Sequence, residues 1–599
     1  MVALVEPHQP AQGTTAEVVG IGSDTGDLHT LDYIIRAAAH VAATAGKPMF
    51  NIHTYASPAY PDQRPGTSGL RKRVEVFRQP GYLQNFIQAI LLTLDETPGR
   101  GWRNQTIVLG GDGRHFNDEA IAQILAMCAA HGVGRVLVGR DGILSTPAAS
   151  HLVRLHEARG ALILSASHNP GGPQGDFGIK LNLAGGAPAP ESITEAIHAR
   201  SCQLEEYAIA EAPPVSLSRP GKQRLGNMLV EVIDPVEDYA RLMASLFDFD
   251  AIAALLGSGR FRLLYDAMHA VTGPYASAIL GERLGLDSDS LIRTRMLPDF
   301  GGEAPDPCLQ HAHELVLALF SDEPPDMGAA SDGDGDRNLI LAPGLMVPTG
   351  DSLAVLAANA SLAPGYAGGI RGIARSMPTS RAADRVAAAL DIPLYETPTG
   401  WKFFCNLLDD GRIDLCGEES FGTSSSHVRE KDGLWAVLFW LNILAIRRES
   451  VTGILHDHWR RYGRDFYLRH DYEGLDLDSA DALIADLHER LPKLAGQEVQ
   501  GVRIDKADEF IYTDPVTGEV ASGHGMRVFL ADGSRLVFRL SGTGTTGATL
   551  RIYGERHEPD ASRHGLPPAT MLAELMQRAR AIARIPEHTG RDQPSAAVG

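Results

Sequence analysis

Cysteine is scarce in this chain of 599 residues, and long apolar runs are missing. The five cysteines form no CxxC pair, and an odd number fits a reducing compartment better than a disulfide framework. The longest apolar run, 434–446, has 13 residues with Asn442 inside it. A membrane span needs about 20 residues, so this run predicts a buried helix. The first residues lack a charged region followed by an apolar core, so we expect no secretory signal.

Positive charge is also in deficit. Lysine and arginine total 54 against 74 aspartate and glutamate residues, which gives a net charge of −20. This balance argues against nucleic acid or an anionic membrane as the main partner. Together with the cysteine usage, it favours a cytoplasmic protein. An acidic chain can still bind an anion where its cations are concentrated in one cleft.

The length predicts about four domains. Short apolar runs alternate with helical stretches, as at 106–110 before a helix at 118–130, which indicates βα units with parallel or mixed sheets. Strand-like runs flank Asp532-Gly533 and predict a hairpin in a smaller, final α+β domain. We place the domains at 49–235, 236–348, 349–448 and 449–560, with an N-terminal extension at 1–48 (a helix at 30–45) and a C-terminal tail at 561–599, disordered from 586.

One hydroxyl stands out directly after a strand. The run 161–164 predicts a short buried strand, and SASHNPGG at 165–172 then presents Ser167 at its end. A serine in this position is usually structural, and its flanks are not the GxSxG of a hydrolase. His168 is adjacent in sequence, but adjacency alone assigns no general base.

The stretch SDGDGDR at 331–337 predicts a metal site. Asp332, Asp334 and Asp336 alternate with glycine, so their carboxylates can face one cation. An EF-hand is excluded, because Arg337 stands at the glycine position and Pro343 at the glutamate position. The alternative is a solvated acidic turn. Few carboxylates, with other ligands from water or phosphate, favour Mg²⁺. A phosphorylated Ser167 beside such a metal would explain both motifs.

Two further groups of motifs predict binding of a sugar phosphate. GEESFG (417–422), PTGWKFF (398–404) and REKDG (429–433) offer hydroxyl-binding groups, and RLSGTGTTGATLR (539–551) offers a glycine loop with donors for a phosphate. Each has a plainer interpretation: acidic loops are common, lone lysines usually face solvent, and a glycine-rich segment can be a simple hairpin turn. The candidate binding residues are Thr399, Gly400, Glu418, Ser420, Lys431, Arg539, Ser541, Thr543 and Arg551.

With these motifs in this order, the chain resembles the eukaryotic-type α-phosphoglucomutases of the α-D-phosphohexomutase superfamily. The resemblance extends from about Asp62 to Tyr553. It is also carried by GTSGLRKRV (66–74), GDFGIKLN (175–182), DAMHAVTGPYA (266–276), SMPTS (376–380), ETPTGWKFF (396–404) and REKDGLWAVL (429–438).

The resemblance implies three similar α/β domains with mixed sheets and a smaller C-terminal α+β domain around a central cleft. It implies reversible interconversion of glucose 1-phosphate and glucose 6-phosphate, part of carbohydrate metabolism, with Mg²⁺ and with glucose 1,6-bisphosphate as intermediate and activator. The expected partner is a small phosphosugar, with no nucleic acid or membrane, and the expected assembly is a monomer or weak dimer.

The resemblance also implies residue roles. Ser167 would carry the phosphoryl group, and Asp332, Asp334 and Asp336 would bind the metal together with a phosphoserine oxygen. His168 and Lys180 would transfer protons, in an order left open, with Arg71 and Arg337 stabilising charge. Glu418 and Ser420 would bind sugar hydroxyls. The non-reacting phosphate would be held by Arg539, Ser541, Thr543 and Arg551.

The chain departs from the family pattern at a few positions without losing a catalytic group. Ser165 stands where threonine is usual, and Arg381 follows SMPTS where a small residue is usual. Ser424-Ser425-Ser426-His427 replaces glycine-serine-aspartate-histidine, so one acidic residue is lost. The alternative functions are a broader phosphohexomutase or phosphopentomutase, a catalytically silent scaffold, and a metal-dependent phosphatase.

Overall fold

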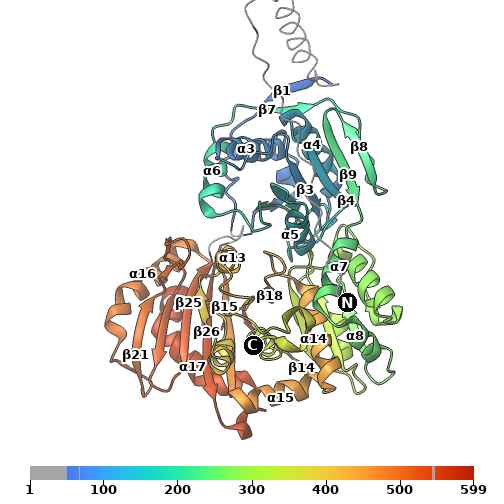
Figure 1. Ribbon diagram of the computed structural model, residues 1–599. Helices are drawn as coiled ribbons and strands as arrows, with labels where there is room; N and C mark the ends of the chain where they lie inside the picture. Colours follow the sequence, from blue (N-terminus) through green and yellow to red (C-terminus); the bar gives the residue numbers. More distant parts are fainter. Residues whose placement is uncertain (1–49, 67, 542–546, 599) are drawn as a thin grey trace, which may run out of the picture. The chain divides into compact units, whose positions relative to one another are not determined.

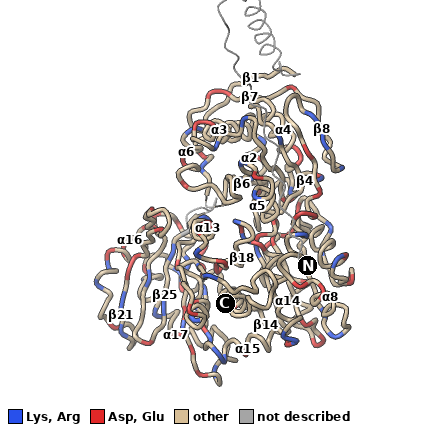
Figure 2. The backbone as a smooth tube through the Cα atoms, viewed as in Figure 1, with Lys and Arg blue, Asp and Glu red and all other residues tan. Residues whose placement is uncertain are grey.

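A computed structural model describes residues 50–66, 68–541 and 547–598 (Figure 1). The predicted extension 1–48, with its expected helix at 30–45, lies outside these residues, and so does Thr543. Within the described ranges, no helix has both the length and the apolar character needed to cross a bilayer. Acidic and basic residues are interspersed along the chain (Figure 2).

The first domain is built on a seven-stranded mixed sheet. Its elements are β1 (Ile52–Ala56), β2 (Leu70–Arg73), α2 (Val74–Phe77), α3 (Tyr82–Glu96), β3 (Thr106–Gly111), α4 (Asn117–His131), β4 (Arg135–Ile143), α5 (Thr146–Leu155), β5 (Gly160–Leu164), β6 (Asp176–Leu183), α6 (Glu191–Ser201), β7 (Glu206–Ala210), β8 (Gly221–Leu225) and β9 (Met228–Ile233). The strand order is β2-β6-β5-β3-β4-β9-β8, and β3 is parallel to both β4 and β5. The predicted strand at 161–164 is therefore a fully buried strand, β5, beside the sheet centre.

The second domain has a five-stranded mixed sheet in the order β11-β10-β12-β13-β14. Its main elements are α7 (Glu237–Leu246), α8 (Phe249–Leu256), β10 (Leu263–Asp266), α9 (Thr272–Ala276), β11 (Leu291–Ile292), α10 (His313–Leu319), β12 (Met327–Ser331), β13 (Asn338–Ala342) and β14 (Leu345–Met346). β10 is parallel to β11 and β12, whereas β12 and β13 are antiparallel. The SDGDGDR segment is the connection between β12 and β13.

The third domain has a four-stranded mixed sheet in the order β16-β15-β17-β18. Its main elements are α11 (Thr349–Ala358), β15 (Ile373–Ser376), α12 (Ala382–Leu390), β16 (Leu394–Thr397), α13 (Lys402–Asp409), β17 (Leu415–Glu418), β18 (Gly422–Ser425), α14 (Gly433–Arg447) and α15 (Val451–Tyr462). β15 is parallel to β16 and β17, and β17 forms an antiparallel hairpin with β18. The GEESFG segment spans the turn of this hairpin.

The apolar run at 434–446 is the buried helix that its length predicted. It forms α14, which contacts β12 and β13 of the second sheet and β18 of the third. Trp435 and Trp440 on this helix are fully buried. Trp459 of α15 belongs to the same hydrophobic core, and α15 contacts α11 and α12. The predicted boundary at 449 is therefore wrong: α15 packs with the third domain, because its apolar face completes that core.

The fourth domain is an antiparallel sheet of seven strands, in the order β20-β21-β24-β25-β26-β19-β27. Its main elements are β19 (Arg464–Leu475), α16 (Leu477–Leu494), β20 (Glu498–Val499), β21 (Val502–Glu509), β22 (Tyr512–Thr513), β23 (Val520–Ala521), β24 (Met526–Leu530), β25 (Arg535–Ser541), β26 (Ala548–Glu558), α17 (Pro568–Ala583), α18 (Ile585–Thr589) and β27 (Ala596–Val598). The predicted hairpin around Asp532-Gly533 is confirmed as β24 and β25. The expected α+β architecture of this domain is confirmed as well.

The expected C-terminal tail is wrong. α17 lies against β19 and β26, with Leu572, Leu575 and Ala579 buried at helical spacing. β27 adds to the sheet by pairing with β19 in antiparallel register. Residues 561–598 are thus part of the fourth domain, because the apolar face of α17 packs against the sheet and β27 extends the sheet next to β19.

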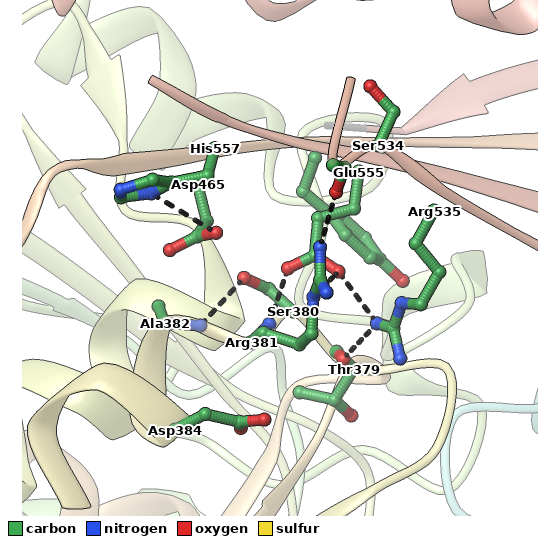
Figure 3. A network of polar contacts seen from close by, with 12 residues as sticks. Thr379, Ser380, Arg381, Ala382, Asp384, Asp465, Ser534, Arg535, Glu555 and His557 are labelled. Atoms are coloured by element: carbon green, nitrogen blue, oxygen red, sulfur yellow. Dashed lines mark hydrogen bonds and ion pairs between the residues drawn. The ribbon is translucent and has the colours of Figure 1, made fainter. Parts of the chain in front are cut away.

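A buried ionic network joins the segment after SMPTS to the fourth sheet (Figure 3). Glu555 of β26 accepts hydrogen bonds from the backbone N–H of Arg381 at 2.5 Å and from its Nε at 3.1 Å. Arg535 of β25 lies 2.8 Å from the same carboxylate and also donates to the carbonyl oxygen of Thr379 at 2.8 Å. The side chain of Arg381 reaches the carbonyl oxygen of Gly533 as well, at 3.0 Å. The large cation at position 381 therefore fastens this segment to the strands of the fourth domain.

Replacing Arg381 with alanine should lower the free energy of unfolding by about 1–3 kcal/mol. The Glu555 carboxylate, only 2% exposed, would lose one of its two cations, and the remaining Arg535 limits the loss. Urea denaturation measures the change. The matched control is Arg412→Ala, which removes an exposed pair with Asp410 and should change the free energy by about 0.5 kcal/mol or less. Equal stability of the two variants would contradict the role given to Arg381.

Candidate functional site

Ser167 is held in a strained backbone conformation just after β5. Its φ angle of 54° lies in the left-handed region, which residues other than glycine rarely adopt. The backbone N–H donates to Ser165 Oγ at 2.7 Å, and the carbonyl oxygen accepts from Arg114 Nη2 at 2.7 Å. Ser165, where the family usually has threonine, thus still supplies the hydroxyl that this position needs.

Two residues that support Ser167 were missed by the sequence analysis. Asp112 accepts a hydrogen bond from Ser165 Oγ at 2.6 Å and pairs with Arg114 Nε at 2.9 Å, and neither charged side chain is exposed to solvent. Burial raises the pKa of Asp112, against the opposing effect of Arg114. A signal was present: Asp112-Gly113-Arg114 directly follow the buried strand β3, and β3 lies parallel to β5, so their carboxyl ends share one sheet edge.

The predicted metal loop meets the predicted hydroxyl. Ser167 Oγ donates to Asp332 Oδ2 at 2.6 Å. The other oxygen, Asp332 Oδ1, accepts the backbone N–H groups of Asp336 at 2.9 Å and Arg337 at 3.0 Å, which curls the loop around it. A side chain at Gly333 would place its Cβ 2.3 Å from the carbonyl oxygen of Ser167, so only glycine allows this approach.

Lysines neutralise part of the acidic cluster. Lys180 Nζ forms an ion pair with Asp334 and lies 3.3 Å from Asp336 Oδ2, while Lys431 Nζ lies 3.1 Å from the same Asp336 oxygen. Burial lowers the pKa of Lys180, but Asp334 and Asp336 outweigh burial, so its pKa is raised and the amine stays protonated. Burial raises the pKa of Asp334, yet the charge of Lys180 lowers it overall. Burial and the two neighbouring carboxylates raise the pKa of Asp332.

The remaining oxygens of the cluster fit a hard cation. Asp332, Asp334 and Asp336 are buried, and one ligand oxygen from each lies within 4.8 Å of the others. Asp334 Oδ1 and Asp336 Oδ1 are buried and have no hydrogen-bond partner among the described residues. Buried carboxylate oxygens without partners destabilise the fold unless a cation binds them. An all-oxygen donor set suits Mg²⁺.

The other predicted catalytic residues lie around this cluster. His168 Nδ1 is 3.3 Å from Ser167 Oγ. Burial, together with the charges of Arg337 and Arg71, holds the pKa of His168 well below its usual value, so its imidazole is neutral at physiological pH. Arg337 Nε lies 4.0 Å from carboxylate oxygens of both Asp332 and Asp336. Arg71 lies on β2, where burial and the charge of Arg337 lower the pKa of its guanidinium against the opposing charge of Asp334.

The predicted sugar-binding residues lie at strand ends of the third sheet. Glu418 ends β17 and accepts the backbone N–H of Gly400 at 2.9 Å. Thr399 Oγ1 is buried without a partner among the described residues, and Ser420 is half-buried. A bridge between Arg337 and Gly422 joins this hairpin to the metal loop. Among the described residues, neither Thr399 nor Ser420 forms a hydrogen bond with Ser167.

Glu419 was missed, although it joins the β17–β18 hairpin to the strands of the fourth domain. Its Oε2 lies 3.0 Å from Arg469 Nη1, and its Oε1 accepts from the hydroxyl of Tyr553 at 3.2 Å. Arg539 donates to that same hydroxyl at 3.2 Å. Burial raises the pKa of Glu419, but Arg469, Arg551 and Arg539 outweigh it and keep the carboxylate charged.

The predicted phosphate-binding residues are only partly described. Arg539 lies on β25 and Arg551 on β26, directly opposite each other in the antiparallel ladder. Arg551 Nε lies 3.9 Å from Asp471 Oδ1. The backbone of Ser541 pairs with Thr549, its side chain is outside the description, and Thr543 lies outside the described residues. The two arginines therefore stand side by side at the base of the glycine-rich loop.

Comparison with known proteins agrees with this architecture. Residues 62–208, 237–344 and 349–462 match family models described as phosphoglucomutase/phosphomannomutase α/β/α domains I, II and III. Residues 464–595 match the phosphoglucomutase-1 C-terminal domain.

Named relatives cover most of the chain. A phosphoglucomutase from Rhizobium radiobacter is 55% identical over 91% of this chain and 99% of its own length. Human phosphoglucomutase-1 is 49% identical over 91% of this chain and 100% of its own. The open-form crystal structure of pp63/parafusin, a phosphoglucomutase from Paramecium, has a TM-score of 0.84 and 43% identity, and covers 91% of this chain and 99% of that one. The chain therefore belongs to the phosphoglucomutase family of the α-D-phosphohexomutase superfamily.

Proposed function

We propose that the protein is a phosphoglucomutase, which interconverts glucose 1-phosphate and glucose 6-phosphate through a phosphorylated Ser167. The observation that carries this proposal is the 2.6 Å contact between Ser167 Oγ and Asp332, within a cluster of three buried carboxylates. A hydroxyl held against a cation site is the arrangement that phosphoryl transfer needs. The names of the relatives support the choice of sugar.

The reaction consists of two transfers. In the first, the free hydroxyl of the bound glucose phosphate attacks the phosphorus on Ser167, the bond to Oγ breaks, and glucose 1,6-bisphosphate forms. In the second, Ser167 Oγ attacks the other phosphate of the bisphosphate after it has turned over in the site. Each attacking hydroxyl loses one proton, and each leaving oxygen gains one, so no further reactant is needed.

The state of the two candidate proton carriers favours different roles. Lys180 is held protonated by Asp334 and Asp336, which suits it to stabilise charge or donate a proton. His168 is neutral and lies 3.3 Å from Ser167 Oγ, so it suits proton acceptance. We propose that His168 accepts the proton of Ser167 in the second transfer, with Arg71 and Arg337 stabilising the charge on the phosphoryl group.

We propose that Asp332, Asp334 and Asp336 hold Mg²⁺ together with an oxygen of phosphorylated Ser167. When bound, the ion would neutralise charge on the phosphoryl group during transfer. The buried, unpartnered oxygens Asp334 Oδ1 and Asp336 Oδ1 support this assignment. Lys431, 3.1 Å from Asp336, balances the remaining negative charge.

The substrate would be held from both ends. We propose that Glu418 and Ser420 bind sugar hydroxyls, with Thr399 and Gly400 beside them. The non-reacting phosphate would be held by Arg539, Ser541, Thr543 and Arg551. Because the sugar contacts do not depend on which phosphate faces Ser167, one site can bind both orientations of the bisphosphate. A monomeric or weakly dimeric state, a cytoplasmic location and activation by added glucose 1,6-bisphosphate stay predictions.

Replacing Ser167 with alanine should lower kcat by at least about a thousandfold, because the group that accepts the phosphoryl unit is gone. A coupled assay of glucose 6-phosphate formation measures this loss. The control is Ser192→Ala, at an exposed position of α6, which should keep full activity. Substantial turnover by the Ser167 variant would rule out the phosphoserine route. Steady release of inorganic phosphate by the unmodified protein would instead indicate a phosphatase.

Removal of divalent cations should abolish the activity, and Mg²⁺ should restore it. Asp332→Asn should raise the Mg²⁺ concentration for half-maximal activity at least about tenfold, because a charged ligand is lost. Asp322→Asn, at an exposed position of the second domain, is the matched control and should leave this concentration unchanged. Activity that survives chelation, or an unaltered Mg²⁺ requirement in the Asp332 variant, would argue against this metal site.

Tyr553→Phe should raise the KM for glucose 1-phosphate at least about fivefold and change kcat less. The lost hydroxyl joins Arg539 to Glu419, and one hydrogen bond is worth about 1 kcal/mol. Tyr467→Phe is the control, since its hydroxyl donates only to the carbonyl oxygen of Pro378 at 3.0 Å. A fall in kcat with unchanged KM would show that Tyr553 does not position the phosphate-binding arginine.

Sugar specificity is tested by comparing kcat/KM for glucose, mannose and ribose 1-phosphates. We expect glucose 1-phosphate to have the highest value. A preference for ribose 1-phosphate would reassign the protein as a phosphopentomutase, and a preference for mannose 1-phosphate would indicate a broader phosphohexomutase.

A further inference from the structure

A second group of metal-binding side chains lies in the second domain, ahead of α10. Asp306, Cys308 and His311 each offer one ligand atom, and the three atoms lie within 4.8 Å of one another. All three residues are half-buried, so solvent ions can reach them. They differ in chemistry from the carboxylate cluster at Ser167, because they combine a thiol, an imidazole and a single carboxylate.

The backbone of this segment is folded into a tight turn. The N–H of Cys308 donates to the carbonyl oxygen of Asp306 at 2.8 Å, and the N–H of His311 donates to that of Cys308 at 3.2 Å. Pro305 and Pro307, both buried, flank Asp306 and fix their own φ angles. Because the turn is held by these bonds and prolines, the three side chains need little ordering to converge on an ion.

One of the three groups, the Asp306 carboxylate, lacks a full set of partners. Asp306 Oδ1 is buried and has no hydrogen-bond partner among the described residues, and the nearest cation, Arg337 Nη1, is 3.6 Å away. Burial raises the pKa of Cys308, and the charge of Asp306 adds to this, while the amides of Gln310 and His311 act in the opposite direction. The sulfur is therefore a neutral thiol before an ion binds.

We propose that Asp306, Cys308 and His311 form a binding site for Zn²⁺ or a chemically similar divalent cation, separate from the Asp332–Asp336 site. Sulfur, nitrogen and oxygen ligands together suit this borderline ion, whereas Mg²⁺ prefers oxygen alone. Binding forms a bond from Cys308 Sγ to the metal and releases the thiol proton to solvent. The thiolate and the Asp306 carboxylate then balance the two charges of the ion, and neutral His311 donates a nitrogen lone pair.

The spacing of the trio is close to that of a bound state. Zinc–ligand bonds of about 2.0–2.3 Å in tetrahedral geometry separate the ligand atoms by about 3.3–3.8 Å. The three ligand atoms lie within 4.8 Å of one another, so a movement of at most about 1.5 Å brings them to these separations, within reach of side-chain rotation. Three protein ligands leave a fourth position for water.

Occupation of this site has a consequence for the catalytic centre, a step that rests on the proposed function. Arg337 lies 3.6 Å from Asp306 and 4.0 Å from both Asp332 and Asp336. A cation bound by Asp306 repels the Arg337 guanidinium. It also neutralises the Asp306 carboxylate, which then no longer attracts Arg337. Since Arg337 stands beside the carboxylates at Ser167, zinc bound at Asp306 should inhibit the enzyme without displacing Mg²⁺.

Cobalt(II) is the probe that tests the site directly. Full-length protein, freed of metal and then saturated with Mg²⁺, is titrated with Co²⁺, and the thiolate-to-cobalt absorption band is followed in the near ultraviolet. We expect a band that saturates at roughly one equivalent, with release of roughly one proton. Cys308→Ser should abolish the band, and His311→Gln should weaken cobalt binding at least about tenfold.

Matched variants separate this site from other thiols. Cys202 is the control, because its Sγ lies 3.8 Å from His198 Nδ1 and forms another cysteine–histidine pair. Cys202→Ser and His313→Gln, the latter at an exposed position two residues from His311, should both keep the band. No band in the unmodified protein, a band retained in Cys308→Ser, or a band lost in Cys202→Ser would each overturn the proposal.

Activity provides a separate readout of the coupling to Arg337. In saturating Mg²⁺, Zn²⁺ should inhibit the unmodified protein at a concentration at least about tenfold lower than it inhibits Cys308→Ser. Equal inhibition of both would place the inhibitory zinc elsewhere and overturn the coupling. The cobalt spectrum does not depend on turnover, so a failure of the proposed mutase function is distinguishable from a failure of this site.

Discussion

The contact between Ser167 Oγ and Asp332 is the constraint on which the rest of the site depends. It brings the end of β5 in the first domain to the β12–β13 connection in the second, with 2.6 Å between the two oxygens. Such an approach places a reactive hydroxyl among three buried carboxylates, which is costly unless cations compensate. Lys180, Lys431 and Arg337 supply part of that compensation, and the unpartnered carboxylate oxygens leave room for a metal ion.

The same buried charges connect the functional segments to one another. The backbone of Arg337 forms a bridge with Gly422 of the β17–β18 hairpin, and Glu419 of that hairpin accepts a hydrogen bond from Tyr553, whose hydroxyl accepts one from Arg539. Farther from the chemistry, Arg381 and Arg535 share the Glu555 carboxylate and fasten the third domain to the fourth. The segments proposed to bind the sugar and the phosphate are thus linked through a few satisfied polar contacts, each sensitive to the loss of one partner.

What the sequence predicted correctly was encoded locally. The run at 161–164 gave β5, the run at 434–446 gave the buried helix α14, and the alternating aspartates gave the carboxylate cluster, because each depends on the spacing of neighbouring residues. Two contacts between distant segments were missed. Asp112 supports Ser165 across 53 positions and Glu419 meets Arg469 across 50. The helix α17 had a visible apolar repeat, but nothing local showed that a sheet would cover it.

Transfer of a phosphoryl group to and from one side-chain oxygen is the central claim, and rapid-quench labelling tests it most directly. The protein would be mixed with glucose 1,6-bisphosphate carrying radioactive phosphate, quenched within one turnover, and digested for peptide mapping. The account predicts label on Ser167 as an increase of about 80 Da in its peptide, which is lost on a chase with unlabelled glucose 1-phosphate as fast as product forms. Label on any other residue, or label on Ser167 that does not leave during turnover, would contradict it.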